Sequence, residues 1–269
     1  MPRAKRFFLP GFIYHITHRC HNRQYLLKYA YEKRRWMTWL SASIEKYDLS
    51  VLGYCVTDNH IHLLAHPGTS QTVIAQSMQL TAGRVGQEYN ERKGRKGAFW
   101  EDRYHATAIQ SHHHLLRCLV YVDLNMVRAK VVEHPGQWQF CGFAEMGKSS
   151  DEACLVDRSA LLQSLGKSDW NRFVARYNNE IEMALDADEL YRSEIWTKSI
   201  AVGDREYVEQ IKENLNKKAH RRKVNKISED SGELEEVCAL QESTPQYGST
   251  HSSEIITGDN TILWDKNAW

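Results

Sequence analysis

The chain has 269 residues, is 42% hydrophobic and carries a formal net charge of +1, which is enough apolar material for one large domain or one domain with an appendage. It has no apolar run near the roughly 20 residues that cross a bilayer, and the apolar part of its basic start, M-P-R-A-K-R-F-F-L-P, is too short for a secretory signal. Six cysteines without a C-x-x-C pair argue against a zinc ribbon and a disulfide framework, and fit a reducing cytoplasm.

The charge is distributed unevenly along the chain. Residues 1–147 hold 19 Lys and Arg against 11 Asp and Glu, a net +8, whereas residues 148–269 hold 16 against 23, a net −7. A basic half is the electrostatic footprint of a nucleic-acid binder, and a solvated surface that happens to be divided is the alternative. The charge distribution alone supports the two interpretations about equally.

The first half of the chain begins with strand and helix patterns in alternation. Residues 12–20 are rich in aromatic and β-branched side chains and predict a strand, and apolar residues at helical spacing predict a helix over 30–47. Two further strands, 49–57 and 60–66, are expected to pair as a hairpin around a turn at Asp58–Asn59.

The pattern continues with a long helix predicted over 71–92, a basic loop over 91–97 and a fourth strand over 103–110. Ser111 is expected to cap a helix that runs to about Lys130. This order of elements predicts the α+β class, with one antiparallel sheet and helices packed on its faces.

A shift in composition after residue 147 divides the chain. We expect a first domain over 1–147, an acidic helical accessory region over 148–216, and a tail over 217–269 that is largely disordered. The tail begins with the basic run K-K-A-H-R-R-K (217–223), which suits a non-specific tether to DNA.

The stretch D-N-H-I-H-L-L-A-H (58–66) contains two histidines one residue apart. On a strand, His60 and His62 point to the same face and can give two nitrogens to one metal ion. A lone H-x-H is nevertheless more often a hydrogen-bonded or solvent-facing pair. His66 shares the face but lies two pleats further along, which favours a place outside the coordination shell. There is no H-E-x-x-H, so a zinc protease has no support.

Tyr121 and Asn125 are four residues apart in a predicted helix and therefore share one face. The amide oxygen of Asn125 is a suitable ligand for Mg²⁺ or Mn²⁺, and a phenol one turn away could attack a phosphodiester beside that ion. Taken alone, each residue is better explained as a core aromatic or a polar surface position, by about two to one.

Four ordered motifs strengthen this interpretation: G-F-I-Y-H-I-T-H-R-C-H-N-R-Q (11–24), L-G-Y-C-V-T-D-N-H-I-H-L-L (52–64), G-A-F-W-E-D-R-Y (97–104) and L-V-Y-V-D-L-N-M-V-R-A-K-V-V (119–132). Together they resemble the single-tyrosine HUH transposases, the insertion-sequence-200-like family that includes the REP-associated tyrosine transposases. Each motif is weak alone, but the ordered set is specific and extends over roughly residues 1–147. The resemblance implies a ferredoxin-like HUH fold for this part.

The resemblance also implies a role for each matching residue. His60, His62 and Asn125 would bind one divalent cation, Mg²⁺ or Mn²⁺, and Tyr121 would be the nucleophile. The implied activity is DNA transposition, in which single-stranded DNA that contains a hairpin is cleaved and rejoined through a 5′-phosphotyrosine. Met126 and Lys130 stand where the family has proline and glycine, which affects the end of the helix more than the chemistry.

Cations are needed to hold the scissile phosphate. The residues predicted to contact DNA are Arg19, Arg23, Arg84, Arg103 and Arg128, of which Arg19 and Arg103 are favoured because they lie inside motifs. Surface solvation is the alternative for several of them. Phe99, Trp100 and Tyr104 could stack on bases, although packing suits at least two of them better.

Two other functions remain open. A domesticated relative could recognise hairpin repeats as a sequence-specific DNA-binding protein without transposing, and a metal-dependent nuclease could use water in place of Tyr121. Relatives that dimerise leave open a homodimer in which Tyr121 acts on the metal site of a partner chain. The expected location is the cytoplasm, at the bacterial nucleoid when bound to DNA, with no contact to a membrane.

Overall fold

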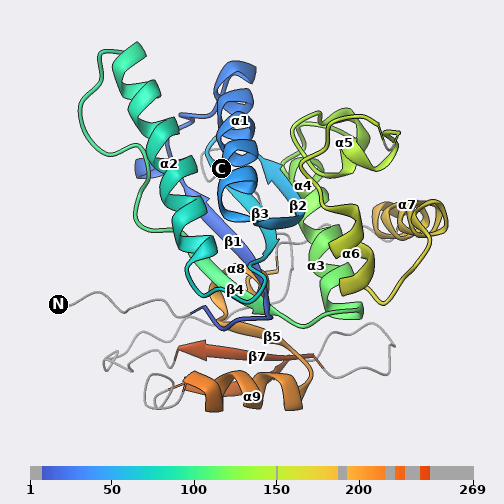
Figure 1. The fold of residues 1–269 in the computed structure, drawn as a ribbon. Helices are drawn as coiled ribbons and strands as arrows, with labels where there is room; N and C mark the ends of the chain where they lie inside the picture. Colours follow the sequence, from blue (N-terminus) through green and yellow to red (C-terminus); the bar gives the residue numbers. More distant parts are fainter. Residues whose placement is uncertain (1–7, 150, 187–192, 216–221, 228–236, 243–269) are drawn as a thin grey trace, which may run out of the picture.

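The computed structural model describes residues 8–149, 151–186, 193–215, 222–227 and 237–242. Four strands from the first half of the chain lie in the order β2-β3-β1-β4 and pair antiparallel (Figure 1). Their bounds are β1 (Ile13–Arg19), β2 (Ser50–Val56), β3 (His60–His66) and β4 (His105–Ile109).

The predicted hairpin of β2 and β3 is confirmed, because Cys55 lies opposite His62 and Val56 opposite Ile61. Residues in register share a face of the sheet, so Thr17 of β1 and His105 of β4 lie on the same face as His62. This face, the histidine face, carries the candidate chemistry.

The second half of the chain extends the sheet. Strand β5 (Ala201–Gly203) pairs parallel with β4, and β7 (Val237–Glu242) and β6 (Arg222–Ile227) follow it in the order β4-β5-β7-β6. The predicted α+β class is confirmed, with one parallel pair in an otherwise antiparallel sheet.

These three strands add to the elements expected for the second half. Strand β5 lies within the accessory region predicted over 148–216, whose other described elements are helices, and β6 and β7 lie within the tail predicted over 217–269. The apolar run Val237–Leu240 is buried, but a run of four residues is too short for periodicity to distinguish from loop. Most of the basic run 217–223 lies outside the described residues.

Helices α1 (Ala30–Tyr47) and α2 (Val73–Arg92) pack together on the face opposite the histidines. There Trp36 of α1 lies against Tyr54, and the Trp100 indole, stacked on His18, donates a hydrogen bond to the carbonyl of Ala82 in α2. Both helices were predicted within a few residues of their observed bounds, because long amphipathic periods are strong signals.

Helices α3 (His113–Asp123) and α4 (Asn125–Arg128) cover the histidine face. One continuous helix from Ser111 to about Lys130 was expected, but the backbone leaves helical dihedral angles at Leu124, with φ −77° and ψ 4°, and the helix is divided there. Ser111 is not the cap either, since His112 occupies that position with a φ of 62°. Leu119 packs so closely on β2 that a Cβ at Gly53 would lie 2.5 Å from it.

The remaining described elements come from both halves of the chain. The helices are α5 (Phe143–Met146), α6 (Arg158–Ser164), α7 (Trp170–Asp186), α8 (Ile195–Lys198) and α9 (Arg205–Leu215), and short 3₁₀ turns occur at η1 (His21–Arg23) and η2 (Pro135–Gln137). The Tyr177 hydroxyl of α7 donates to the buried Asp123 carboxylate of α3 over 2.7 Å. Among the described residues, no helix is both long and apolar enough to cross a membrane.

Lys130 ends α4 in a strained conformation. Its φ is 55°, and the amides of Lys130 and Val131 donate to the carbonyls of Val127 and Met126, the pair of bonds that forms a Schellman motif. The helix therefore stops at Lys130, at the cost of a left-handed conformation in a residue other than glycine.

Lys130→Gly is expected to raise the free energy of unfolding by about 1 kcal/mol, because glycine adopts a positive φ without steric cost. Urea unfolding measures the change. The matched control is Ala129→Gly one residue earlier, in a right-handed helical conformation, which should lower stability by about 0.5–1 kcal/mol. Destabilisation by Lys130→Gly would show that side-chain contacts of Lys130 outweigh its backbone strain.

Candidate active site

A pocket of about 440 Å³ opens on the histidine face, at the end of the sheet where β1 stops and β3 and β4 begin. It brings together all four residues predicted to carry the chemistry, His60, His62, Tyr121 and Asn125. His62 and Asn125 are buried and His60 is half-buried, so the pocket has a protected floor and an accessible rim.

A chain of hydrogen bonds fixes the tautomer of His62. Nδ1 of the fully buried His15 donates to the Trp196 carbonyl over 2.8 Å, so Nε2 of the neutral His15 ring can only accept. Nδ1 of His62 donates to it over 2.9 Å. The Nε2 lone pair of His62 then faces Nδ2 of Asn125, 2.8 Å away.

Burial supports the neutral state of His15 in this chain. Desolvation lowers the pKa of His15 to about 4, with smaller contributions from the nearby positive charges of His105 and Arg128. The bond to the Trp196 carbonyl acts in the other direction but does not outweigh burial. His15 is therefore uncharged near neutral pH and has one N–H to give.

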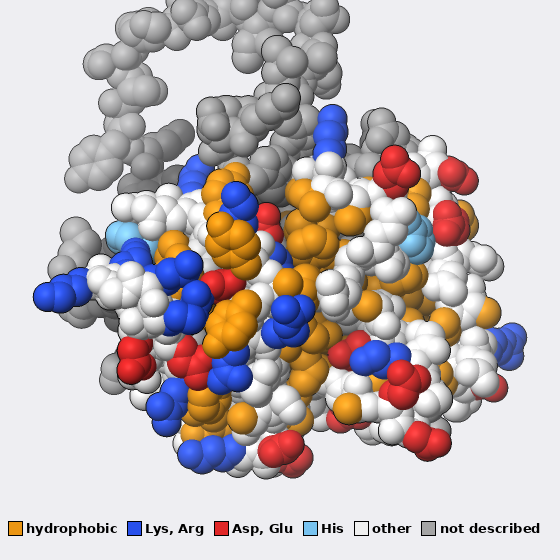
Figure 2. Space-filling view, turned by 90° about the horizontal axis from the view of Figure 1, so that it is seen from above, with side chains coloured by type: hydrophobic (Ala, Val, Ile, Leu, Met, Phe, Trp, Pro, Cys, Tyr) orange, Lys and Arg blue, Asp and Glu red, His pale blue; other side chains and the backbone are white. Residues whose placement is uncertain are grey.

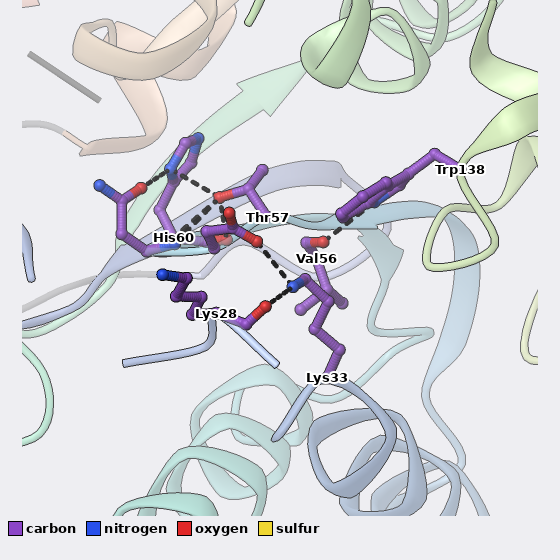
Figure 3. A network of polar contacts seen from close by, with 8 residues as sticks. Lys28, Lys33, Val56, Thr57, His60 and Trp138 are labelled. Carbon is purple, nitrogen blue, oxygen red and sulfur yellow. Dashed lines mark hydrogen bonds and ion pairs between the residues drawn. The ribbon is translucent and has the colours of Figure 1, made fainter. Parts of the chain in front are cut away.

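His60 is oriented by a separate network at the turn between β2 and β3 (Figure 3). Its Nδ1 lies 2.7 Å from Oδ1 of Asn59 and 2.9 Å from Oγ1 of Thr57. The Asn59 oxygen only accepts, so Nδ1 of His60 carries a proton, and in the neutral ring Nε2 keeps the lone pair. Two unrelated networks thus select the same tautomer at both histidines.

Tyr121 lies at the wall of the same pocket. Its side chain is 7% exposed, and its ring centre is 5.9 Å from that of His62 and 6.3 Å from that of Trp196. The Arg128 guanidinium is 4.1 Å from the centre of the Tyr121 ring and also donates to the Tyr121 carbonyl. A buried cation is therefore fixed directly beside the phenol.

Residues 9–125 match the family described as "Transposase IS200 like", a segment that begins before β1 and ends at Asn125. This segment of the chain is therefore similar to the IS200-like transposases, and the predicted resemblance to that family is confirmed.

Other comparisons add little to the family match. No curated protein matches the chain. Among solved structures, a REP-associated tyrosine transposase bound to a REP hairpin is similar at 17% identity with a TM-score of 0.45, over 60% of this chain and 96% of that one. A candidate transposase from Deinococcus radiodurans is similar at 16% identity with a TM-score of 0.32, over 45% of this chain and 95% of that one.

The predicted arginines fall into two groups. Arg19, Arg23, Arg103 and Arg128 line the pocket. Arg84 does not, because it projects from α2 with its guanidinium 5.3 Å from the Trp39 ring centre, and α2 covers the opposite face of the sheet. The sequence could not assign a face to α2, whose apolar stripe is broken.

The aromatic residues considered for base stacking mostly pack inside the protein. Phe99 is buried, the Trp100 ring stacks on His18 with centres 4.1 Å apart, and the Tyr104 ring stacks on Phe8. Packing was the better explanation for at least two of them, and the geometry agrees.

Several pocket residues escaped sequence reasoning. Glu194, Thr197 and Lys198 line the pocket from the second half of the chain. His15, quoted only as part of a motif, is fully buried behind the pocket and contacts His62. Segment α8 lies across β1 and β4, held by hydrogen bonds from His105 and Thr107 to the Ser199 carbonyl. Alternation along β1 could have placed His15 on the histidine face, but no pattern in the sequence predicted α8.

Proposed function

We propose that the protein cleaves and rejoins single-stranded DNA through a 5′-phosphotyrosine formed at Tyr121. The observation that carries the proposal is convergence within one chain: Tyr121 lies beside His62, which itself contacts Asn125. This arrangement supports an active site completed in cis, with residues 1–147 as the catalytic domain and 148–216 as an accessory region that reaches into the pocket.

His60, His62 and Asn125 suit one divalent cation, Mg²⁺ or Mn²⁺. Both histidines keep an Nε2 lone pair, and a half-turn of the Asn125 carboxamide would put Oδ1 where Nδ2 lies now. The described residues contain no group of three or more His, Cys, Asp or Glu that could hold a metal ion. Bound there, the cation would polarise the scissile phosphate.

In the proposed reaction, the Tyr121 oxygen forms a bond to the scissile phosphorus and the bond to the 3′ oxygen breaks. The phenol loses its proton, and the leaving 3′ oxygen ends as a hydroxyl. A second 3′ hydroxyl can attack the phosphotyrosine and release Tyr121. Each step exchanges one phosphodiester for another, so no ATP is consumed. Arg128 holds positive charge beside the phenol as the phosphate arrives.

The remaining cations of the pocket suit the phosphates on either side of the scissile bond. Arg19, Arg23 and Arg103 lie at its rim together with Lys198, and their affinity for DNA should fall with added salt. Arg84 stays a proposed contact to DNA outside the pocket. The proposed partner is single-stranded DNA that contains a hairpin.

Covalent trapping tests the proposal. The protein is incubated with Mn²⁺ and a labelled hairpin oligonucleotide with single-stranded flanks, and adducts are separated under denaturing conditions. We expect an adduct whose modified peptide, identified by mass spectrometry, contains Tyr121. Cleavage without an adduct would instead identify a hydrolytic nuclease. Tight binding with neither cleavage nor adduct on a panel of hairpins would identify a DNA-binding protein.

A further inference from the structure

Three tyrosines stand exposed beside the start of α1. The described residues include five exposed large hydrophobic side chains, and three of them fall within seven residues: Tyr25 (46% exposed), Tyr29 (61%) and Tyr31 (49%). Exposed apolar side chains are ordinary when scattered, whereas a cluster of aromatic rings marks a surface that binds something. We call these three residues the tyrosine patch.

Positive charge surrounds the tyrosine patch. Nζ of Lys28 and Nζ of Lys93 each lie 5.9 Å from the centre of the Tyr29 ring, and the Arg92 guanidinium lies 4.8 Å from that of Tyr31. Lys93 and Arg92 come from the end of α2, which runs antiparallel to α1. Figure 2 looks onto this end of the molecule, where Lys and Arg side chains intersperse with exposed hydrophobic ones.

The tyrosine patch continues from the pocket. Arg23 lines the pocket and lies two residues before Tyr25. The loop that leads from Arg23 to α1 is anchored by Lys33 of α1. The Lys33 ammonium donates to the Lys28 carbonyl and forms a 2.6 Å ion pair with Asp58, which lies in the turn between β2 and β3 next to the network of His60 (Figure 3). A bound polymer that leaves the pocket past Arg23 would therefore reach the tyrosine patch next.

We infer that the tyrosine patch binds unpaired bases of a single-stranded nucleic acid that extends out of the pocket. Every base offers a flat face to a tyrosine ring, and Lys28 and Lys93 beside the Tyr29 ring are placed to contact the phosphates between the bases, whereas Arg92 is paired with the buried Glu32 carboxylate. An acidic protein segment would use the cations but has no need of three flat rings. The identification of the strand as DNA rests on the proposed function, whereas the stacking surface itself does not.

Binding without cleavage tests the inference. Fluorescence anisotropy in EDTA gives the Kd of the full chain for a 20-nucleotide single strand and for a strand of equal length with abasic sites. The double substitution Tyr29→Ala with Tyr31→Ala is expected to raise the Kd for the normal strand roughly tenfold or more, and to leave the Kd for the abasic strand within about twofold. Tyr29→Phe with Tyr31→Phe should bind as the unmodified protein does.

Met183→Ala, which removes another exposed apolar side chain, is the matched control and should change neither Kd. Equal binding of the normal strand by the double alanine variant would overturn the inference, as would an equal loss on both strands. The adduct assay is separate: adduct formation with unaltered binding by the alanine variant refutes only the stacking surface. Base-dependent loss of binding in a protein that never forms an adduct refutes only the proposed chemistry.

Discussion

Tyr121→Phe is expected to reduce covalent adduct formation by roughly 10⁴-fold or more while leaving the Kd values for DNA and Mn²⁺ within about twofold of the unmodified protein. The substitution removes one oxygen atom and keeps the ring that packs against His62 and Arg128. The pocket therefore keeps its shape and its cations and loses only the nucleophile. Denaturing gels measure the adduct, and anisotropy and calorimetry measure the two affinities.

Tyr89→Phe is the matched control for Tyr121→Phe. Tyr89 is half-buried on α2, on the face of the sheet opposite the pocket, and its ring contacts Phe99. The Tyr89→Phe variant should form adducts at the rate of the unmodified protein. Substantial metal-dependent cleavage by Tyr121→Phe would mean that water attacks the phosphate, and loss of DNA binding in the same variant would mean that the phenol serves binding.

The core of the candidate site could be predicted because its signals are local. Strand alternation places His60 and His62 on one face, and helical spacing places Asn125 one turn from Tyr121. That spacing survives the irregularity at Leu124, since the Leu124 amide still donates to the Val120 carbonyl and the Arg128 amide to the Leu124 carbonyl. The sequence did not contain the packing of α3 on the sheet, which brings the two pairs together.

The parts that could not be predicted depend on contacts between distant residues. The His15–His62 hydrogen bond joins residues 47 positions apart through the register of β1 and β3, and the Trp196 carbonyl is 181 positions from His15. Arg84 was grouped with the other arginines because charge and motif carry no information about which face of the sheet a helix covers. A short helix such as α8 has no periodicity to reveal it.

His15→Phe is expected to weaken Mn²⁺ binding roughly 10- to 100-fold, although residue 15 would not touch the ion. Phenylalanine fills a similar volume but can neither donate to the Trp196 carbonyl nor accept from Nδ1 of His62. His62 then loses the partner that keeps its proton on Nδ1, and the Nε2–H tautomer, which cannot bind a cation, becomes populated. Electron paramagnetic resonance of free Mn²⁺ gives the Kd without any need for activity.

If His15 only filled space, its replacement would leave the tautomer of His62 unchanged. A change in the His62 tautomer therefore shows that His15 acts through its hydrogen bond to His62. Long-range ¹H–¹⁵N spectra of the metal-free protein should show His62 as the Nδ1–H form, and as a mixture in His15→Phe. His114→Phe is the matched control, because His114 is also buried but lies on α3 away from the pocket lining, and it should keep both the tautomer and the Mn²⁺ affinity. If His15→Phe folds, keeps the His62 tautomer and binds Mn²⁺ as before, the hydrogen-bond chain from Trp196 does not position the metal ligand.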